Sequence, residues 1–146
     1  MKVHDVMTKD PVSVTPGATI REAAQIMKRD KIGIVPVIDA SESKRLVGIV
    51  TDRDIAIRIV ADGRDGATRV SEVMSTSRLA TCTPDDDLDD AMEAMASEQV
   101  RRIPIVDAHG SLVGIVSQAD IVRKADDGKA ERTVEEISRP SGKHAQ

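Results

Sequence analysis

The 146-residue chain contains no Phe, Tyr or Trp and a single cysteine. Proteins that bind single-stranded nucleic acid stack bases on aromatic side chains, so this absence argues against that class. A base-like ligand would have to be held between aliphatic side chains. The single cysteine, Cys82, excludes an intrachain disulfide and a cysteine-based metal site, and it makes a reducing cytoplasm the expected compartment.

Positive charge and long apolar runs are also scarce. Lys and Arg number 21 against 25 Asp and Glu, which gives a net charge of −4, the wrong sign for broad binding of nucleic-acid phosphates. No apolar run is long enough to span a membrane, and a Thr-Lys-Asp-Pro turn at residues 8–11 leaves no room for a signal-peptide core. We therefore expect a cytoplasmic protein with no nucleic-acid and no membrane partner.

The sequence is duplicated. Residues 15–39 align without a gap on residues 83–107, 46–51 align on 112–117, and Val3–Met7 match Val70–Met74. Each copy has about 60 residues, too few to bury a sufficient core alone. The predicted division is repeat 1 over 1–62, a linker over 63–69, repeat 2 over 70–124 and a flexible polar tail over 125–146.

The hydrophobic pattern of each copy predicts the order strand, helix, strand, strand, helix. Apolar residues at i, i+3, i+4 and i+7 predict helices at 20–27 and 88–95. Apolar, β-branched runs predict strands at 32–38, 46–50, 100–106 and 112–116, and closing helices follow Thr51 and Ser117. The expected fold is α/β (α+β), with two β-α-β-β-α repeats packed sheet to sheet with pseudo-two-fold symmetry.

Two motifs carry a resemblance to a known family. Ile-Val-Pro-Val-Ile-Asp (34–39) and Arg-Ile-Pro-Ile-Val-Asp (102–107) each precede Gly-h-h-[Thr/Ser]-x-x-Asp-Ile, where h is apolar. From Val3 to about Arg123 the chain resembles a tandem pair of CBS domains (a Bateman module) in a stand-alone CBS domain-containing protein. The resemblance implies a non-enzymatic regulatory sensor that forms a homodimer and signals to an unknown effector protein.

The resemblance also implies two clefts between the repeats, which hold adenosine-containing ligands such as AMP, ADP, ATP or S-adenosylmethionine. In the family the motif Asp accepts hydrogen bonds from the ribose hydroxyls, and the Thr or Ser three residues earlier faces the phosphates. One cleft would combine Thr15, Ile20, Ile32, Gly33 and Ile34 with Ile115, Ser117 and Asp120. The other would combine Thr83, Leu88, Val100, Arg101 and Arg102 with Ile49, Thr51, Arg53 and Asp54.

Alternatives accompany these assignments. Thr51-x-x-Asp54 and Ser117-x-x-Asp120 also fit capping boxes, in which the two side chains satisfy the start of a helix. Arg53 and Arg101 predict that the Asp54 cleft takes the more highly phosphorylated ligand, because guanidinium groups pair well with phosphate; otherwise they pair with Asp86, Asp87 or Glu98. The alternative function is a stress-associated interaction or structural module whose degenerate clefts bind no nucleotide.

The remaining acidic, histidine and cysteine residues do not form a pattern that predicts metal binding or catalysis. The acidic residues at 85–90 follow Pro84 in a first helical turn, where carboxylates are stabilised anyway, so Mg²⁺ is expected only where it accompanies a bound nucleotide. His4, His109 and His144 lack the spacing of metal ligands, and Cys82 has no His near it in sequence. We predict no catalytic residues, no metal site and no required cofactor.

Overall fold

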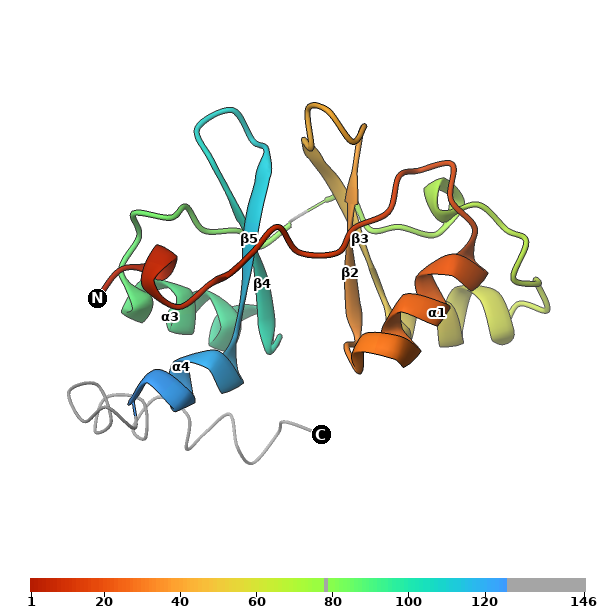
Figure 1. The fold of residues 1–146 in the computed structure, drawn as a ribbon. Coiled ribbons are helices and arrows are strands. Elements are labelled where there is room, and N and C mark those ends of the chain that lie inside the picture. The colour runs from red at the N-terminus through yellow and green to blue at the C-terminus, as the bar shows by residue number, and fades with distance from the viewer. Residues whose placement is uncertain (78, 126–146) are drawn as a thin grey trace. The chain divides into compact units, whose positions relative to one another are not determined.

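The structure, a computed structural model, describes residues 1–77 and 79–125 (Figure 1). The predicted tail, apart from Ala125, and His144 therefore lie outside the described residues. Among those described, no helix is both long and apolar enough to cross a membrane. The chain folds into two compact units: unit 1 contains Met1–Pro11, Ala80–His109 and the chain from Val113, and unit 2 contains Val12–Leu79 and Gly110–Leu112.

Unit 2 is built around an antiparallel pair of strands. Its elements are α1 (Ile20–Asp30), β2 (Ile34–Ile38), β3 (Leu46–Thr51), α2 (Asp52–Ile55), which continues as the π-helical turn η2 (Ala56–Val60), and the 3-10 turn η3 (Val70–Glu72). In the β2–β3 ladder Ile34 lies opposite Thr51. Thr19 caps α1 in a capping box with Glu22. Ala23, Val35, Val37, Val50 and Val73 are fully buried in the core of this unit.

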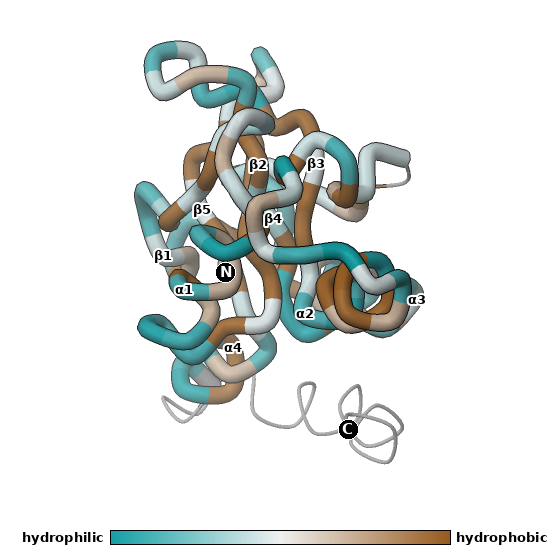
Figure 2. The backbone as a smooth tube through the Cα atoms, turned by 90° about the vertical axis from the view of Figure 1, so that its right-hand side faces the viewer, coloured by the Kyte–Doolittle hydropathy of each residue, from teal (hydrophilic) through white to brown (hydrophobic). Residues whose placement is uncertain are grey.

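Unit 1 repeats this arrangement. It contains η1 (Val3–Asp5), β1 (Thr8–Lys9), α3 (Leu88–Glu98), β4 (Arg102–Val106), β5 (Leu112–Ser117), whose first residue belongs to unit 2, and α4 (Gln118–Ala125). The strand order is β1-β5-β4. Figure 2 shows hydrophobic residues along β2, β3, β4 and β5 and hydrophilic residues in connecting loops. Val3, Ala91, Ile103, Ile105 and Val116 are fully buried in the core.

Each compact unit combines most of one repeat with the first residues of the other repeat, which we call its leading segment. Residues 1–11 begin repeat 1 but pack in unit 1, and residues 70–77 begin repeat 2 but pack in unit 2. Thr8 pairs with Ile115 of β5, and Ser75 pairs with Ile49 of β3. The compact units therefore group the chain differently from the sequence order of the repeats.

Two glycines of the repeated Val-Gly-Ile-Val motif allow this close approach. A Cβ on Gly48 would lie 2.9 Å from the backbone oxygen of Ser75, and a Cβ on Gly114 would lie 2.5 Å from Met7 Sδ. Contacts this short are not sustained by real Cβ atoms, so a side chain at Gly48 must displace the backbone at Ser75, and one at Gly114 must displace at least the Met7 side chain.

The predicted order of helices and strands is confirmed, with a difference at the first strand of repeat 2. The helices at Ile20 and Leu88, the later strands and the closing helices all form. Before the first helix, repeat 1 has the two-residue strand β1 and the bridge of Val14 with Val37, whereas the described part of repeat 2 has isolated bridges instead of a strand, among them Cys82 opposite Ile105. Pro16 and Pro84 follow two residues later, and proline has no N–H to extend the pairing.

Candidate functional site

The junction between β3 and α2 in unit 2 carries the first motif threonine and aspartate. The Thr51 N–H donates to Asp54 Oδ2 at 3.0 Å, and the Asp54 N–H donates to Thr51 Oγ1 at 3.1 Å. Both side chains are half-buried. This reciprocal pair is a capping box, so the capping interpretation is confirmed for this junction.

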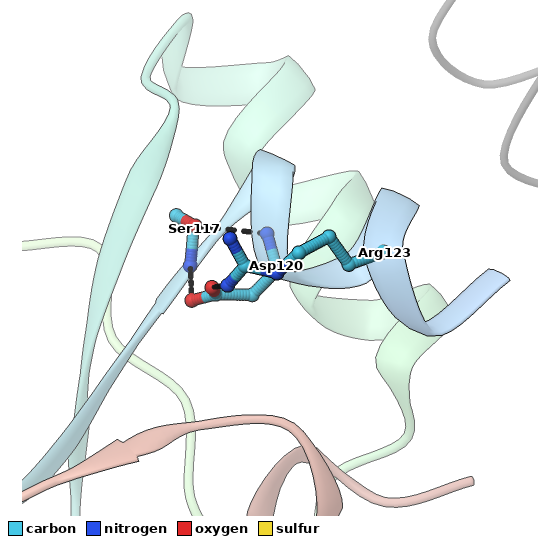
Figure 3. Close-up of polar contacts among 3 residues, drawn as sticks. All are labelled: Ser117, Asp120 and Arg123. Atoms are coloured by element: carbon cyan, nitrogen blue, oxygen red, sulfur yellow. Dashed lines mark hydrogen bonds and ion pairs between the residues drawn. The ribbon is translucent and has the colours of Figure 1, made fainter. Parts of the chain in front are cut away.

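The equivalent junction of unit 1 lies between β5 and α4. The Ser117 N–H donates to Asp120 Oδ2 at 3.2 Å, and the Asp120 N–H donates to Ser117 Oγ at 3.0 Å. Figure 3 shows these bonds and a third one, from Arg123 Nη2 to Asp120 Oδ1. Ser117 is the one buried polar residue in the described part of the chain, 8% exposed, so this junction is less accessible than its counterpart.

The two aspartates share one bond and differ in the other. Each uses Oδ2 to accept the N–H of its cap residue. Asp120 Oδ1 is paired with Arg123, whereas Asp54 Oδ1 forms no hydrogen bond or ion pair with any residue that the structure describes. The residue three positions after Asp54 is Ile57, 45% exposed, whose side chain has no hydrogen-bond donor. Asp54 therefore keeps one carboxylate oxygen available for a ligand.

The residues that precede β2 and β4 lie beside the strand-to-helix junctions. The Asp52 N–H donates to the Gly33 carbonyl at 2.9 Å, and the Gln118 N–H donates to the Arg101 carbonyl at 2.8 Å. At Gly33, a Cβ would lie 2.9 Å from Asp52 Oδ2, so the Asp52 carboxylate occupies the space of a side chain. In each unit, a backbone hydrogen bond thus connects the residue just before the first strand of the β-pair (Gly33 or Arg101) to the first residue of the closing helix (Asp52 or Gln118).

The predicted ligand residues divide between the units. Unit 2 holds Thr15, Ile20, Ile32, Gly33, Ile34, Ile49, Thr51, Arg53 and Asp54, and unit 1 holds Thr83, Leu88, Val100, Arg101, Arg102, Ile115, Ser117 and Asp120. Each predicted cleft draws on both units and stays a prediction. Within the units, Ile20, Ile34 and Leu88 are buried, with Ile20 and Leu88 in the hydrophobic cores. Core packing is therefore a role that these two residues already have.

Arg53 and Arg101 are exposed and form no ion pair with the residues that the structure describes. Two of their alternative partners are bonded elsewhere. Asp86 Oδ2 accepts the Thr83 N–H at 2.9 Å, and Asp87 Oδ1 pairs with Lys2 Nζ at 3.0 Å. Both guanidinium groups therefore remain available to a phosphate.

The thiol of Cys82 lies in surroundings that keep it protonated. Cys82 is buried, and burial, followed by the nearby Asp86 and Asp90, raises the pKa of its thiol to about 11. A protonated thiol is a poor nucleophile and metal ligand. Among residues 1–77 and 79–125, no three His, Cys, Asp or Glu side chains are placed to hold a metal ion.

Sequence reasoning did not single out Arg123. Its signal was present, because a basic residue three positions after an acidic one lies on the same side of a helix. The resemblance directs attention to the Thr/Ser and Asp positions that the two repeats share, and Arg123 is where they differ.

Comparisons with known proteins agree with this duplicated architecture. A model of the CBS domain matches residues 3–61 and 70–127. The CBS domain-containing protein YhcV of Bacillus subtilis (strain 168) is 49% identical over 119 residues, which cover 82% of this chain and 81% of that protein.

Two solved structures have similar folds. The CBS domain pair of protein MJ0100, in complex with 5′-methylthioadenosine and S-adenosyl-L-methionine, has a TM-score of 0.75 and 30% identity over 88% of this chain and 98% of its own. CBSX2 in complex with AMP has a TM-score of 0.74 and 28% identity over 86% and 96%. The chain therefore belongs to the CBS domain family and contains two CBS domains in tandem.

Proposed function

We propose that this chain is a non-enzymatic regulatory module that binds adenosine-containing ligands, of the AMP, ADP, ATP or S-adenosylmethionine class, at its two strand-to-helix junctions. The observation that carries the proposal is the half-buried Asp54, which keeps one carboxylate oxygen available beside a capped helix start. A carboxylate oxygen without a partner is a strong acceptor for the hydroxyl groups of a ribose.

The similar solved structures support the ligand class. One of them contains AMP, and the other contains 5′-methylthioadenosine and S-adenosyl-L-methionine. All three molecules share an adenosine moiety, so the proposal names this moiety rather than one nucleotide. The absence of aromatic residues means that the adenine would be held by aliphatic side chains, of which Ile32, Ile49, Val100 and Ile115 are half-buried beside the junctions.

The exposed arginines extend the proposal to the phosphates. Arg53 follows Thr51 in unit 2. Arg101, which is predicted to line the Asp54 cleft, belongs to unit 1, where its carbonyl group accepts the Gln118 N–H beside Ser117. Guanidinium groups pair with phosphate oxygens in two-pronged geometry. We expect Arg53→Ala and Arg101→Ala to weaken binding of ATP more than that of AMP, as measured by titration calorimetry. Equal binding of ATP to both variants and the wild type contradicts this assignment.

A thermal-shift panel tests the function as a whole. AMP, ADP, ATP with and without Mg²⁺, S-adenosylmethionine and NADH are each added to the full chain, with an extrinsic dye because Trp and Tyr are absent. A ligand that binds only the folded state stabilises it by about 2.7 kcal/mol at one hundred times its Kd. An increase in Tm with at least one adenosine compound, and no release of ADP from ATP, is the expected result.

Two results of this panel would contradict the proposed function. If no adenosine compound changes the Tm, the sensing function is wrong, and the interaction or structural module that binds no nucleotide takes its place. Release of ADP from ATP would make the chain an enzyme and contradict the non-enzymatic assignment.

We also expect a homodimer that signals to a separate effector protein. Ile57 and Val60, which follow α2, and Val122 in α4 are large hydrophobic residues that are 45%, 72% and 42% exposed. Apolar side chains exposed in this way are typical of surfaces that bind another protein. Light scattering during gel filtration should give twice the 15.7 kDa mass of the chain. A monomer at micromolar concentration contradicts this expectation.

A further inference from the structure

The two junction aspartates differ in one neighbour on their own helix. Asp120 Oδ1 accepts a hydrogen bond from Arg123 Nη2, one helical turn further on (Figure 3). At the same position after Asp54 the chain has Ile57, which cannot donate. The difference arises within each junction and does not depend on the rest of the site.

The ion pair limits what Asp120 can accept. Its Oδ2 already takes the Ser117 N–H, so both carboxylate oxygens have a partner. Arginine only donates and stays charged at all relevant pH values. Ribose hydroxyls also bind a carboxylate by donating. They would approach the oxygen that the guanidinium group already covers, so the two compete for the space around Oδ1.

The exposures show which partner can move away. The Arg123 side chain is 73% exposed, whereas that of Asp120 is 14% exposed and is fixed by the capping box. Arg123 can therefore turn into solvent and give up only its ion pair with Asp120. Asp120 cannot leave without breaking the start of α4.

We propose that Arg123 is a specificity-determining residue that competes with ligand hydroxyls for Asp120 Oδ1. The junction of unit 1 then binds the ribose less tightly than the junction of unit 2, where Asp54 has no such competitor. The inference rests on the proposed function, because it assumes that the aspartates accept ribose hydroxyls. Exposed ion pairs are weak, so the expected effect is a factor of about two to five in affinity.

The test isolates each junction and then exchanges the two residues. In an Asp54→Asn background, Arg123→Ile gives repeat 2 the residue of repeat 1; in an Asp120→Asn background, Ile57→Arg does the reverse. Lys124→Gln is the matched control, because it removes the same charge from the next residue without touching the ion pair. Each variant is titrated calorimetrically with adenosine and with 2′,3′-dideoxyadenosine, which lacks the competing hydroxyls.

Arg123→Ile should raise the affinity for adenosine about two- to fivefold and leave that for dideoxyadenosine unchanged. Arg123→Lys should restore the wild-type affinity, Ile57→Arg should lower the affinity of the other junction, and Lys124→Gln should change neither. An affinity for adenosine that stays the same or falls in Arg123→Ile overturns the inference alone. Failure of the wild-type chain to bind adenosine overturns the proposed function and the inference with it.

Discussion

The two strand-to-helix junctions have the same backbone plan and different side-chain chemistry. Both use a capping box in which an aspartate accepts the N–H of the residue that ends the strand. Ser117 is buried, and its aspartate is paired with Arg123; Thr51 is half-buried, and its aspartate keeps an oxygen available. The comparison teaches that duplication preserves the element that starts the helix, while single substitutions nearby change what each copy can bind.

The largest effect on the free energy of unfolding is expected at the two glycines where a leading segment packs against a strand. Gly48→Ala brings a Cβ against the backbone oxygen of Ser75, and Gly114→Ala brings one against the flexible side chain of Met7. Overpacking of this kind costs about 1–3 kcal/mol, and a backbone atom yields less easily than a methionine. We expect Gly48→Ala to lower the free energy of unfolding in urea more than Gly114→Ala does. Equal losses would show that the two crossings are equally tight.

The capping hydroxyls give the next effect. Ser117→Ala and Thr51→Ala each remove an acceptor from the N–H of the motif aspartate, at a typical cost of about 1 kcal/mol. The loss should be larger at Ser117, because it is buried and water cannot replace the missing acceptor. Chemical denaturation of the two variants measures the difference. A larger loss in Thr51→Ala contradicts the ranking.

The last effect distinguishes the two units only at alkaline pH. Cys82 in unit 1 occupies the position of Val14 in unit 2, and burial raises the pKa of its thiol to about 11 from a usual 9.0. The folded chain then holds a proton that the unfolded chain releases above pH 9. The stability contributed by this group is therefore present below pH 9 and is lost as the pH rises toward 11.

The matched variant for this pH dependence is Cys82→Val, which gives unit 1 the residue of unit 2. The slope of the unfolding free energy between pH 9 and pH 11 should be smaller in Cys82→Val than in the wild type. An unchanged slope would mean that Cys82 does not contribute to it. Slow alkylation of the wild-type thiol at pH 8 is the accompanying expectation, because the reactive thiolate is scarce there.

Much of the fold could be predicted because the same pattern of apolar and capping residues occurs in both repeats. The spacing of apolar residues locates α1 and α3, and the capping pattern locates the starts of α2 and α4. The exchange of leading segments could not be predicted, because Val3–Met7 and Val70–Met74 have nearly the same pattern and either could pack with either copy. Gly48 and Gly114 carried a hint, since a glycine inside a strand indicates that another backbone approaches closely.

The candidate site was predicted in part. The motif aspartates and their hydroxyl partners were found by comparing the repeats, and their capping bonds are confirmed. Arg123 was missed because it belongs to one repeat only. A search for shared residues finds what duplication has kept and overlooks what distinguishes the copies.

The most direct measurement of the central claim is calorimetric titration of AMP into the wild-type chain, Asp54→Asn and Asp120→Asn. Asparagine keeps the capping geometry but loses the negative charge that attracts ribose hydroxyls. We expect that the wild type binds AMP, that Asp54→Asn loses the tighter binding step, and that Asp120→Asn retains it. Binding that is the same in all three proteins would contradict the role of these carboxylates.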